Sequence, residues 1–162
     1  MQKINPFLWL DNQAEEAAKF YVSVFKNSKI RKISYYPDGP AKKIGREPGS
    51  VMMVEFTLDG VEFIALNAGP QFKFTESVSF VVYADTQEEV DNYWEKLTAD
   101  GGQPGACSWL KDKFGLSWQV QPRRLIELVT DPDKPTAERV MNAMMDMDKI
   151  DIAMLEQAAA SR

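Results

Sequence analysis

The chain has 162 residues, a length typical of one domain, and its 44% hydrophobic and 27% charged residues indicate a globular protein. Its net charge of −5 and scattered Lys and Arg residues exclude the basic face that a nucleic-acid-binding protein presents to phosphates. The single cysteine, Cys107, excludes an internal disulfide, and the absence of histidine excludes every catalytic dyad or triad that needs an imidazole.

No targeting or membrane segment is predicted. The first five residues carry no apolar signal region, and no apolar run approaches the roughly 20 residues of a membrane span. We therefore expect a cytoplasmic protein that has neither a membrane nor a nucleic acid as its partner.

The first half of the chain predicts one strand, one helix and three further strands. Residues 4–10 are apolar and aromatic, as in a buried strand, and apolar residues then recur at helical spacing from Ala14 to Phe25. Asp59-Gly60 predicts a two-residue hairpin turn with positive φ. The remaining expected segments are strands over 30–36, 51–58 and 61–67 and a loop rich in Pro, Gly and Lys over 37–49.

The second half repeats this order at an offset of about 73 residues, which places Phe7 on Phe80. A strand over 78–83 precedes helix-cap residues at Asp85-Thr86, and Gly101-Gly102 stops the helix that follows. Segments 108–111 and 116–121 then flank a turn as a hairpin. The prediction is a single α+β domain with two βαβββ modules, 1–75 and 76–122.

The segment 123–162 predicts a C-terminal helical extension. Pro135 fits the first turn of one helix, and Asp151 fits the N-cap of a short terminal helix. The methionines of this segment form a flexible apolar surface that suits either packing against the sheet or the contact of a homodimer. They are Met141, Met144, Met145 and Met147.

Five stretches carry a resemblance to a known family: PFLWLDNQAEEAAKFY, VEFTLDGVEFIALNAGPQFKFT, SFVVYADTQEEVDNYWEKL, CSWLKDKFGLSWQVQP and KIDIAMLE. They are similar to the vicinal-oxygen-chelate superfamily, which includes glyoxalase I, bleomycin-resistance proteins and ring-cleaving dioxygenases. Within it the chain resembles the PhnB-like, or demethylubiquinone methyltransferase-like, group. The resemblance implies that the two modules curl into an open barrel-like cleft. We also expect a homodimer.

In that superfamily one residue from each of four strands holds a metal ion. Carried over by position, these residues are Pro6, Ala65 or Asn67, Ser79 and Gln119. None is a carboxylate, an imidazole or a thiolate, the ligands that divalent metals prefer. We therefore expect no metal and no cofactor.

The resemblance and the many aromatic residues together favour metal-independent binding of a small molecule, planar or aromatic, in the cleft between the modules. The expected ligand-binding residues are Trp9, Asn67, Ser79, Trp109, Trp118 and Gln119.

Two other functions remain open. One is an enzyme of unknown reaction in the same cleft that uses a carboxylate or Lys111, although the chain has no glycine-rich strand-to-helix turn for S-adenosylmethionine. Its candidate acids are Glu55 and Glu62, which flank one hairpin, and Asp112, which lies in what is more simply a solvated turn. The other is a scaffold whose methionine-rich tail binds a partner protein.

Overall fold

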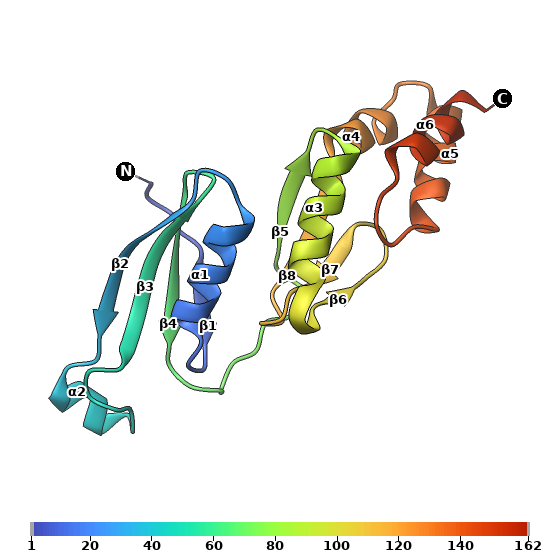
Figure 1. The fold of residues 1–162 in the computed structure, drawn as a ribbon. Coiled ribbons are helices and arrows are strands. Elements are labelled where there is room, and N and C mark those ends of the chain that lie inside the picture. Colours follow the sequence, from blue (N-terminus) through green and yellow to red (C-terminus); the bar gives the residue numbers. More distant parts are fainter. Residues whose placement is uncertain (1, 162) are drawn as a thin grey trace. The chain divides into compact units, whose positions relative to one another are not determined.

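A computed structural model describes residues 2–161 and contains two four-stranded sheets, each accompanied by a helix (Figure 1). The chain separates into two compact units, Met1–Lys73 and Phe74–Arg162. The predicted α+β class and the paired modules are confirmed.

The first unit is a βαβββ module with strand order β1-β4-β3-β2, in which β1 runs parallel to β4 and the other pairs are antiparallel. Helix α1 buries Ala17, Tyr21 and neighbouring residues on one face of this sheet, where the Tyr21 ring stacks on Phe56. The elements are β1 (Phe7–Leu10), α1 (Ala14–Val24), β2 (Lys29–Tyr35), α2 (Asp38–Lys43), β3 (Val51–Leu58) and β4 (Val61–Asn67).

The segment predicted as a loop over 37–49 contains the short helix α2, so this part of the prediction is wrong. Pro40 and Gly39 concealed it, because both residue types lower helix propensity. Pro40 lies in the first turn of α2, where proline has no intrahelical hydrogen bond to lose.

The hairpin turn predicted between β3 and β4 is confirmed. Asp59 and Gly60 have φ angles of 45° and 79°, the left-handed backbone that such a turn requires. The turn fixes the β3–β4 register, in which Leu58 pairs with Val61 and Phe56 with Phe63.

We expect Gly60→Ala to lower the free energy of unfolding by about 1 kcal/mol, because a Cβ atom disfavours positive φ. Urea denaturation measures the change. Gly39→Ala is the matched control, since Gly39 lies in α2 and a Cβ atom there meets nothing within 4 Å. If the two substitutions lowered the free energy of unfolding equally, the requirement for glycine at position 60 would be contradicted.

The second unit repeats the topology, with strand order β5-β8-β7-β6 and β5 parallel to β8. Its βαβββ elements are β5 (Ser79–Ala84), α3 (Gln87–Thr98), β6 (Gln103–Pro104), β7 (Trp109–Lys111) and β8 (Ser117–Pro122), with a short 3-10 turn, η1 (Ala99–Gly101), after α3. The sequence pattern did not locate β6, because a two-residue strand is too short for alternation to show. Gly102 is required after η1, since a Cβ atom there would lie 2.6 Å from the carbonyl oxygen of Leu97.

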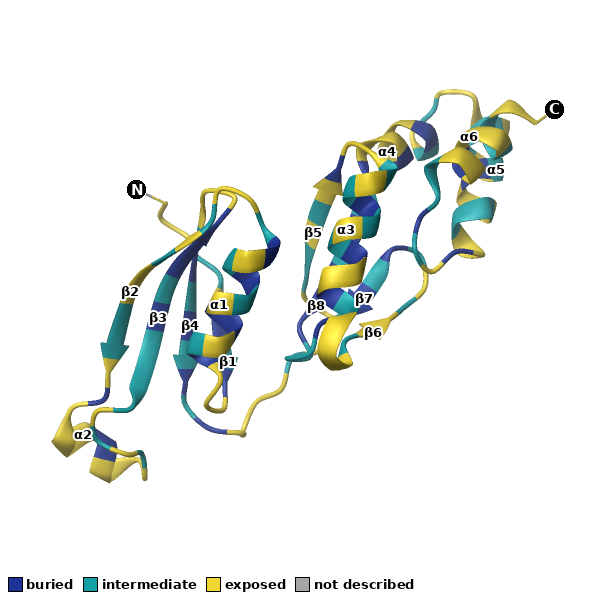
Figure 2. Cartoon of the chain, viewed as in Figure 1, coloured by how far each residue is buried: buried dark blue, intermediate teal, exposed yellow. Residues whose placement is uncertain are grey.

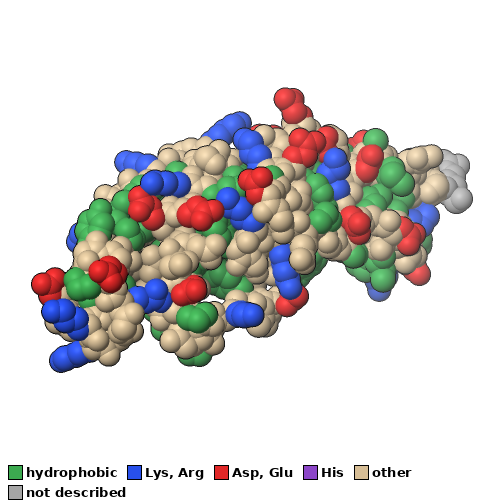
Figure 3. Space-filling view, turned by 60° about the horizontal axis from the view of Figure 1, so that its bottom comes forward, with side chains coloured by type: hydrophobic (Ala, Val, Ile, Leu, Met, Phe, Trp, Pro, Cys, Tyr) green, Lys and Arg blue, Asp and Glu red, His purple; other side chains and the backbone are tan. Residues whose placement is uncertain are grey.

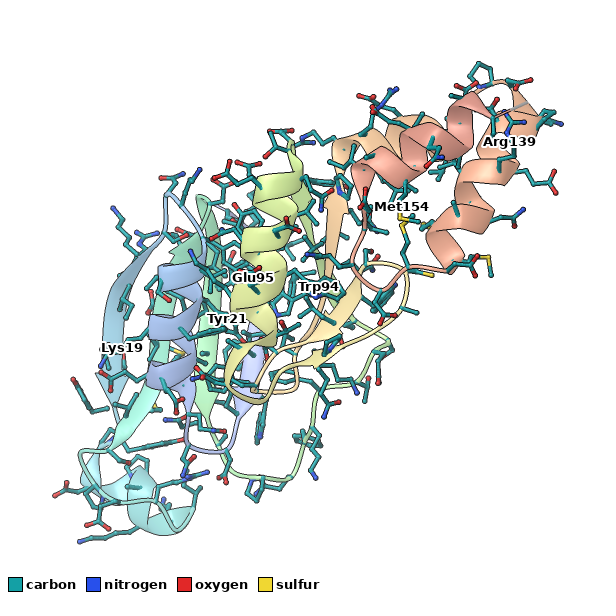
Figure 4. All side chains as sticks on the ribbon, turned by 45° about the vertical axis from the view of Figure 1, so that its right-hand side comes forward. Lys19, Tyr21, Trp94, Glu95, Arg139 and Met154 are labelled. Carbon is teal, nitrogen blue, oxygen red and sulfur yellow. The ribbon has the colours of Figure 1, made fainter. Side chains whose placement is uncertain are left out.

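The C-terminal extension forms three helices, α4 (Arg123–Val129), α5 (Lys134–Met145) and α6 (Ile152–Ala160). The predicted Pro135 start and Asp151 N-cap are confirmed, and the Asp151 side chain accepts a hydrogen bond from the Met154 backbone N–H. Arg139, labelled in Figure 4, donates to the carbonyl oxygens of Ala158 and Ala159 and so caps the end of α6. The helices share a core of their own: Leu125, Leu128, Val140, Met147, Ile150 and Leu155.

Polar contacts attach this extension to the module before it. The Gln87 side chain donates to the Ile150 carbonyl and accepts from the Ile152 N–H, at 3.0 and 2.9 Å. The backbone N–H groups of Cys107 and Ser108 donate to the Met147 and Asp148 carbonyls. Cys107 is half-buried and its backbone is held by this hydrogen bond, an environment typical of a structural cysteine.

No helix within residues 2–161 has the length and apolarity that crossing a membrane requires. On the face drawn in Figure 3, basic and acidic side chains alternate without a patch of one sign.

Candidate functional site

In each unit the helix covers one face of the sheet and leaves the other without a helix of that unit. Buried residues of α1 and α3 turn toward their sheets (Figure 2), while Lys19 and Glu95 on the same helices are exposed (Figure 4). Side chains alternate between the two faces of a strand. We call the face of the second sheet opposite α3 its open face; it carries Ser79, Val81, Tyr83, Trp109, Lys111, Ser117, Gln119 and Gln121.

Three of these residues form a chain of hydrogen bonds across β5 and β8. The Gln119 Nε2 group donates to Ser79 Oγ at 2.9 Å, and Gln121 Nε2 donates to Gln119 Oε1 at 2.7 Å. Trp109 pairs directly with Gln119 across β7 and β8. The structure therefore brings three of the six predicted ligand-binding residues together: Ser79, Trp109 and Gln119.

A pocket of about 250 Å³ lies beside them, at the β6–β7 side of the open face. Trp109, Lys111 and Ser117 come from this face, and Glu76 comes from the segment before β5. The pocket is slightly smaller than the roughly 300–1,000 Å³ of sites for drug-sized molecules, so it suits a small compound or part of a larger one. Its full lining is Glu76, Gln103, Pro104, Gly105, Trp109, Leu110, Lys111 and Ser117.

The wall of the pocket contains one polar atom without a partner. Ser117 is 1% exposed, and its Oγ makes no hydrogen bond to the described residues. A buried hydroxyl in a native protein is normally satisfied, by water if not by protein. Sequence reasoning missed Ser117 and Gln121, although they lie two residues before and two residues after Gln119 in β8 and therefore share its face.

Charge in the pocket is confined to one ion pair. The Lys111 ammonium donates to the Glu76 carboxylate, and this hydrogen bond holds the pKa of Glu76 below its usual value of 4.5. Both side chains are at least partly exposed, so the pair is weak and can exchange with other groups. Glu76 lies in a connection between modules, where no sequence pattern marked it.

We expect Lys111→Met to raise the pKa of Glu76 toward its usual value, because the donor that favours the carboxylate is removed. In the native protein the ion pair's contribution to the free energy of unfolding is fully present above pH 4.5. This contribution is lost as the pH falls through the lowered pKa of Glu76. Carboxyl-detected NMR titration measures both values. Lys42→Met, on the exposed surface of α2, should leave the titration of Glu76 unchanged.

Trp118 lies on the opposite face of the second sheet from Gln119 and Trp109. Its ring packs against Phe80 at 5.5 Å, and its indole N–H donates to Asp112 Oδ2 at 2.8 Å. Asp112 is 3% exposed and also accepts from the backbone N–H groups of Phe114 and Leu116. The expectation of a solvated turn is therefore corrected: Asp112 is a buried acceptor that fixes the β7–β8 hairpin.

We expect Asp112→Asn to lower the free energy of unfolding by roughly 1–3 kcal/mol, because an amide N–H₂ would face either the indole or the backbone donors. Urea denaturation followed by tryptophan fluorescence measures the loss. Asp148→Asn, at an exposed position, is the control. An Asp112→Asn variant as stable as that control would overturn the role.

The other two predicted residues belong to the first unit and lie on opposite faces of its sheet. Trp9 is half-buried, donates to the Gly69 carbonyl at 2.8 Å and meets Phe72 edge-on. Asn67 is buried on the α1 side, where Oδ1 accepts from the Ala14 N–H and Nδ2 donates to the Val51 carbonyl. Its amide therefore holds the start of α1 against the sheet.

The residues at the superfamily's metal positions do not fit a metal ion. Both polar atoms of the Asn67 amide and of the Gln119 amide are engaged with protein groups, and Pro6 has no side-chain donor. Within residues 2–161 no three Asp, Glu or Cys side chains cluster as metal ligands would. Glu62 pairs with Arg31, and its direct strand neighbour is Thr57 rather than Glu55.

Paired βαβββ modules with helices on one face of each sheet define the glyoxalase-type fold of the vicinal-oxygen-chelate superfamily. The family model described as 3-demethylubiquinone-9 3-methyltransferase matches residues 2–121. The chain belongs to this PhnB-like family, as its sequence resemblance predicts.

Solved structures agree with this assignment. A candidate 3-demethylubiquinone-9 3-methyltransferase, PhnB protein, from Bacillus cereus is 36% identical, with 75% of this chain and 99% of that chain covered and a TM-score of 0.66. Protein PA1353 from Pseudomonas aeruginosa is 18% identical, with coverages of 75% and 98% and a TM-score of 0.59.

The fosfomycin resistance protein FosX from Listeria monocytogenes, complexed with Mn(II) and sulfate, shares the fold at 13% identity, with coverages of 75% and 91% and a TM-score of 0.51. Among curated protein sequences no match was found.

Proposed function

We propose that this protein binds a small planar or aromatic molecule without a metal, and that the open face of the second sheet is central to the site. One observation carries the proposal: the hydrogen-bonded chain Ser79–Gln119–Gln121 lies beside a pocket walled by Trp109. An indole supplies a flat apolar surface, and neighbouring amides orient a ligand by hydrogen bonding.

The proposal that binding needs no metal is supported by the lack of suitable metal-ligating side chains at the superfamily's metal positions. Ser79 and Gln119 satisfy each other, whereas a hard cation requires carboxylates and a softer one requires imidazole or thiolate. FosX was solved with Mn(II). Under this proposal the chain shares the fold of FosX but binds its ligand without a metal.

The methyltransferase description of the family finds no support in the strand-to-helix connections. Residues 11–13 join β1 to α1, and Asp85-Thr86 joins β5 to α3; neither contains glycine. A nucleotide-like cofactor such as S-adenosylmethionine requires a glycine-rich turn at such a point. The alternative of an enzyme in the same site rests on Lys111, which the structure holds in an ion pair with Glu76.

Thermal shift against a panel of planar antibiotics and quinones tests the proposal. A bound compound at 100 times its Kd stabilises the native state by about 2.7 kcal/mol, which raises the melting temperature. We expect Trp109→Ala to weaken binding by roughly tenfold or more, since a stacked aromatic contact is lost. Gln119→Leu, of similar size, should also weaken it.

Tyr35→Ala, at an exposed strand position of the first unit, is the control and should bind as the native protein does. EDTA should leave the shift unchanged. Stoichiometric Zn, Ni, Mn or Fe in the purified protein would overturn metal independence, and a panel without any shift would overturn ligand binding.

The homodimer and the cytoplasmic location remain predictions. Met141 and Met145 are exposed on α5, whereas Met147 is buried in the helical core and Met144 packs against it. The exposed pair is what a dimer contact through the tail would use, and the mass measured by light scattering decides whether a dimer forms.

A further inference from the structure

We propose that the pocket bounded by Trp109, Lys111 and Ser117 recognises the acidic group of a small organic acid, with Lys111 and Ser117 as its donors. This inference rests on the proposed function, because it names the class of molecule that the same site takes.

The unpartnered hydroxyl of Ser117 is the first reason. Its Oγ is buried, lacks a partner in the described chain and belongs to a residue that lines the pocket. Leaving a buried hydroxyl unsatisfied is unfavourable, so a polar group of a bound molecule that accepts a hydrogen bond from it is stabilised there. Ser117 pairs directly with Lys111 across β7 and β8, so the two side chains lie next to each other on the open face.

The ion pair is the second reason. Lys111 is the only cationic side chain among the residues that line the pocket, and Glu76 is the only anionic one. Glu76 is well exposed and comes from a short connection outside the sheet, so its carboxylate can leave Lys111 without disturbing a strand. The Glu76 carboxylate occupies the position that the carboxylate of a bound acid would take. Glu76 therefore competes with such a ligand for Lys111.

The remaining walls limit the size of the ligand. Trp109 and Pro104 supply apolar surface, and the volume of about 250 Å³ admits one or two fused rings rather than an extended chain. An aromatic carboxylate places its ring against Trp109 and its charge on Lys111 and Ser117. Charge-assisted hydrogen bonds of this kind are roughly twice as strong as neutral ones.

Calorimetry with 2-naphthoate and 2-naphthamide tests the inference, because the two probes share a ring system and differ in charge. The native protein should bind the acid roughly tenfold more tightly than the amide. Lys111→Met should abolish this preference, and Glu76→Gln should strengthen binding of the acid several-fold because the competing carboxylate is gone. Lys42→Met, on α2, should change neither affinity.

Ser117→Ala separates a binding role from a structural one. It should weaken the acid several-fold while leaving the melting temperature of the free protein unchanged or higher, because it removes an unsatisfied buried group. Ser108→Ala is its matched control: Ser108 Oγ is also buried without a partner in the described residues, yet Ser108 does not line the pocket. That variant should bind the acid normally.

The outcomes are distinguishable. Equal binding of acid and amide, or an acid preference that survives Lys111→Met, overturns this inference and leaves the proposed function standing. Full affinity of the Ser117→Ala variant overturns the role of the hydroxyl. If neither these probes nor the panel of planar compounds binds, both proposals fail.

Discussion

One constraint shapes each half of this molecule: a single helix can bury only one face of a four-stranded sheet. In the first unit α1 packs on the face of Phe56, and in the second α3 packs on the face of Trp118. Because successive side chains alternate, every residue beside them in the chain points to the other face. The apolar side chains of each strand pack against the helix. The open face therefore carries the polar side chains of the hydrogen-bonded chain and the pocket.

In the second unit, neighbouring residues of one strand are divided between the buried core and the proposed ligand site. Trp118 and Asp112 hold the β7–β8 hairpin from the buried side, with the indole N–H on a carboxylate that also accepts two backbone donors. Ser117 and Gln119, one residue to either side of Trp118, face the pocket or the Ser79 hydroxyl. A site on two paired strands gains rigidity from this arrangement, since the hairpin that presents it is fixed by a satisfied buried network.

The residues at the superfamily's metal positions also make their contacts within the protein. Asn67 and Gln119 occupy strands that carry ligands in metal-binding relatives, but their amides bond to the protein instead. The proposed metal-free site is compatible with the fold, because packing of the helices on the sheets does not depend on a metal.

The sequence alone determined the order of elements apart from α2 and β6, the Asp59-Gly60 turn and the caps at Pro135 and Asp151, because these depend on local periodicity and backbone preference. It also determined that these 162 residues supply no imidazole. Only the tertiary structure decided which face each aromatic residue occupies, that Asp112 is buried, and that Glu76 meets Lys111. These facts depend on pairing between segments far apart in the chain, and a one-residue change of register would reverse every one of the faces.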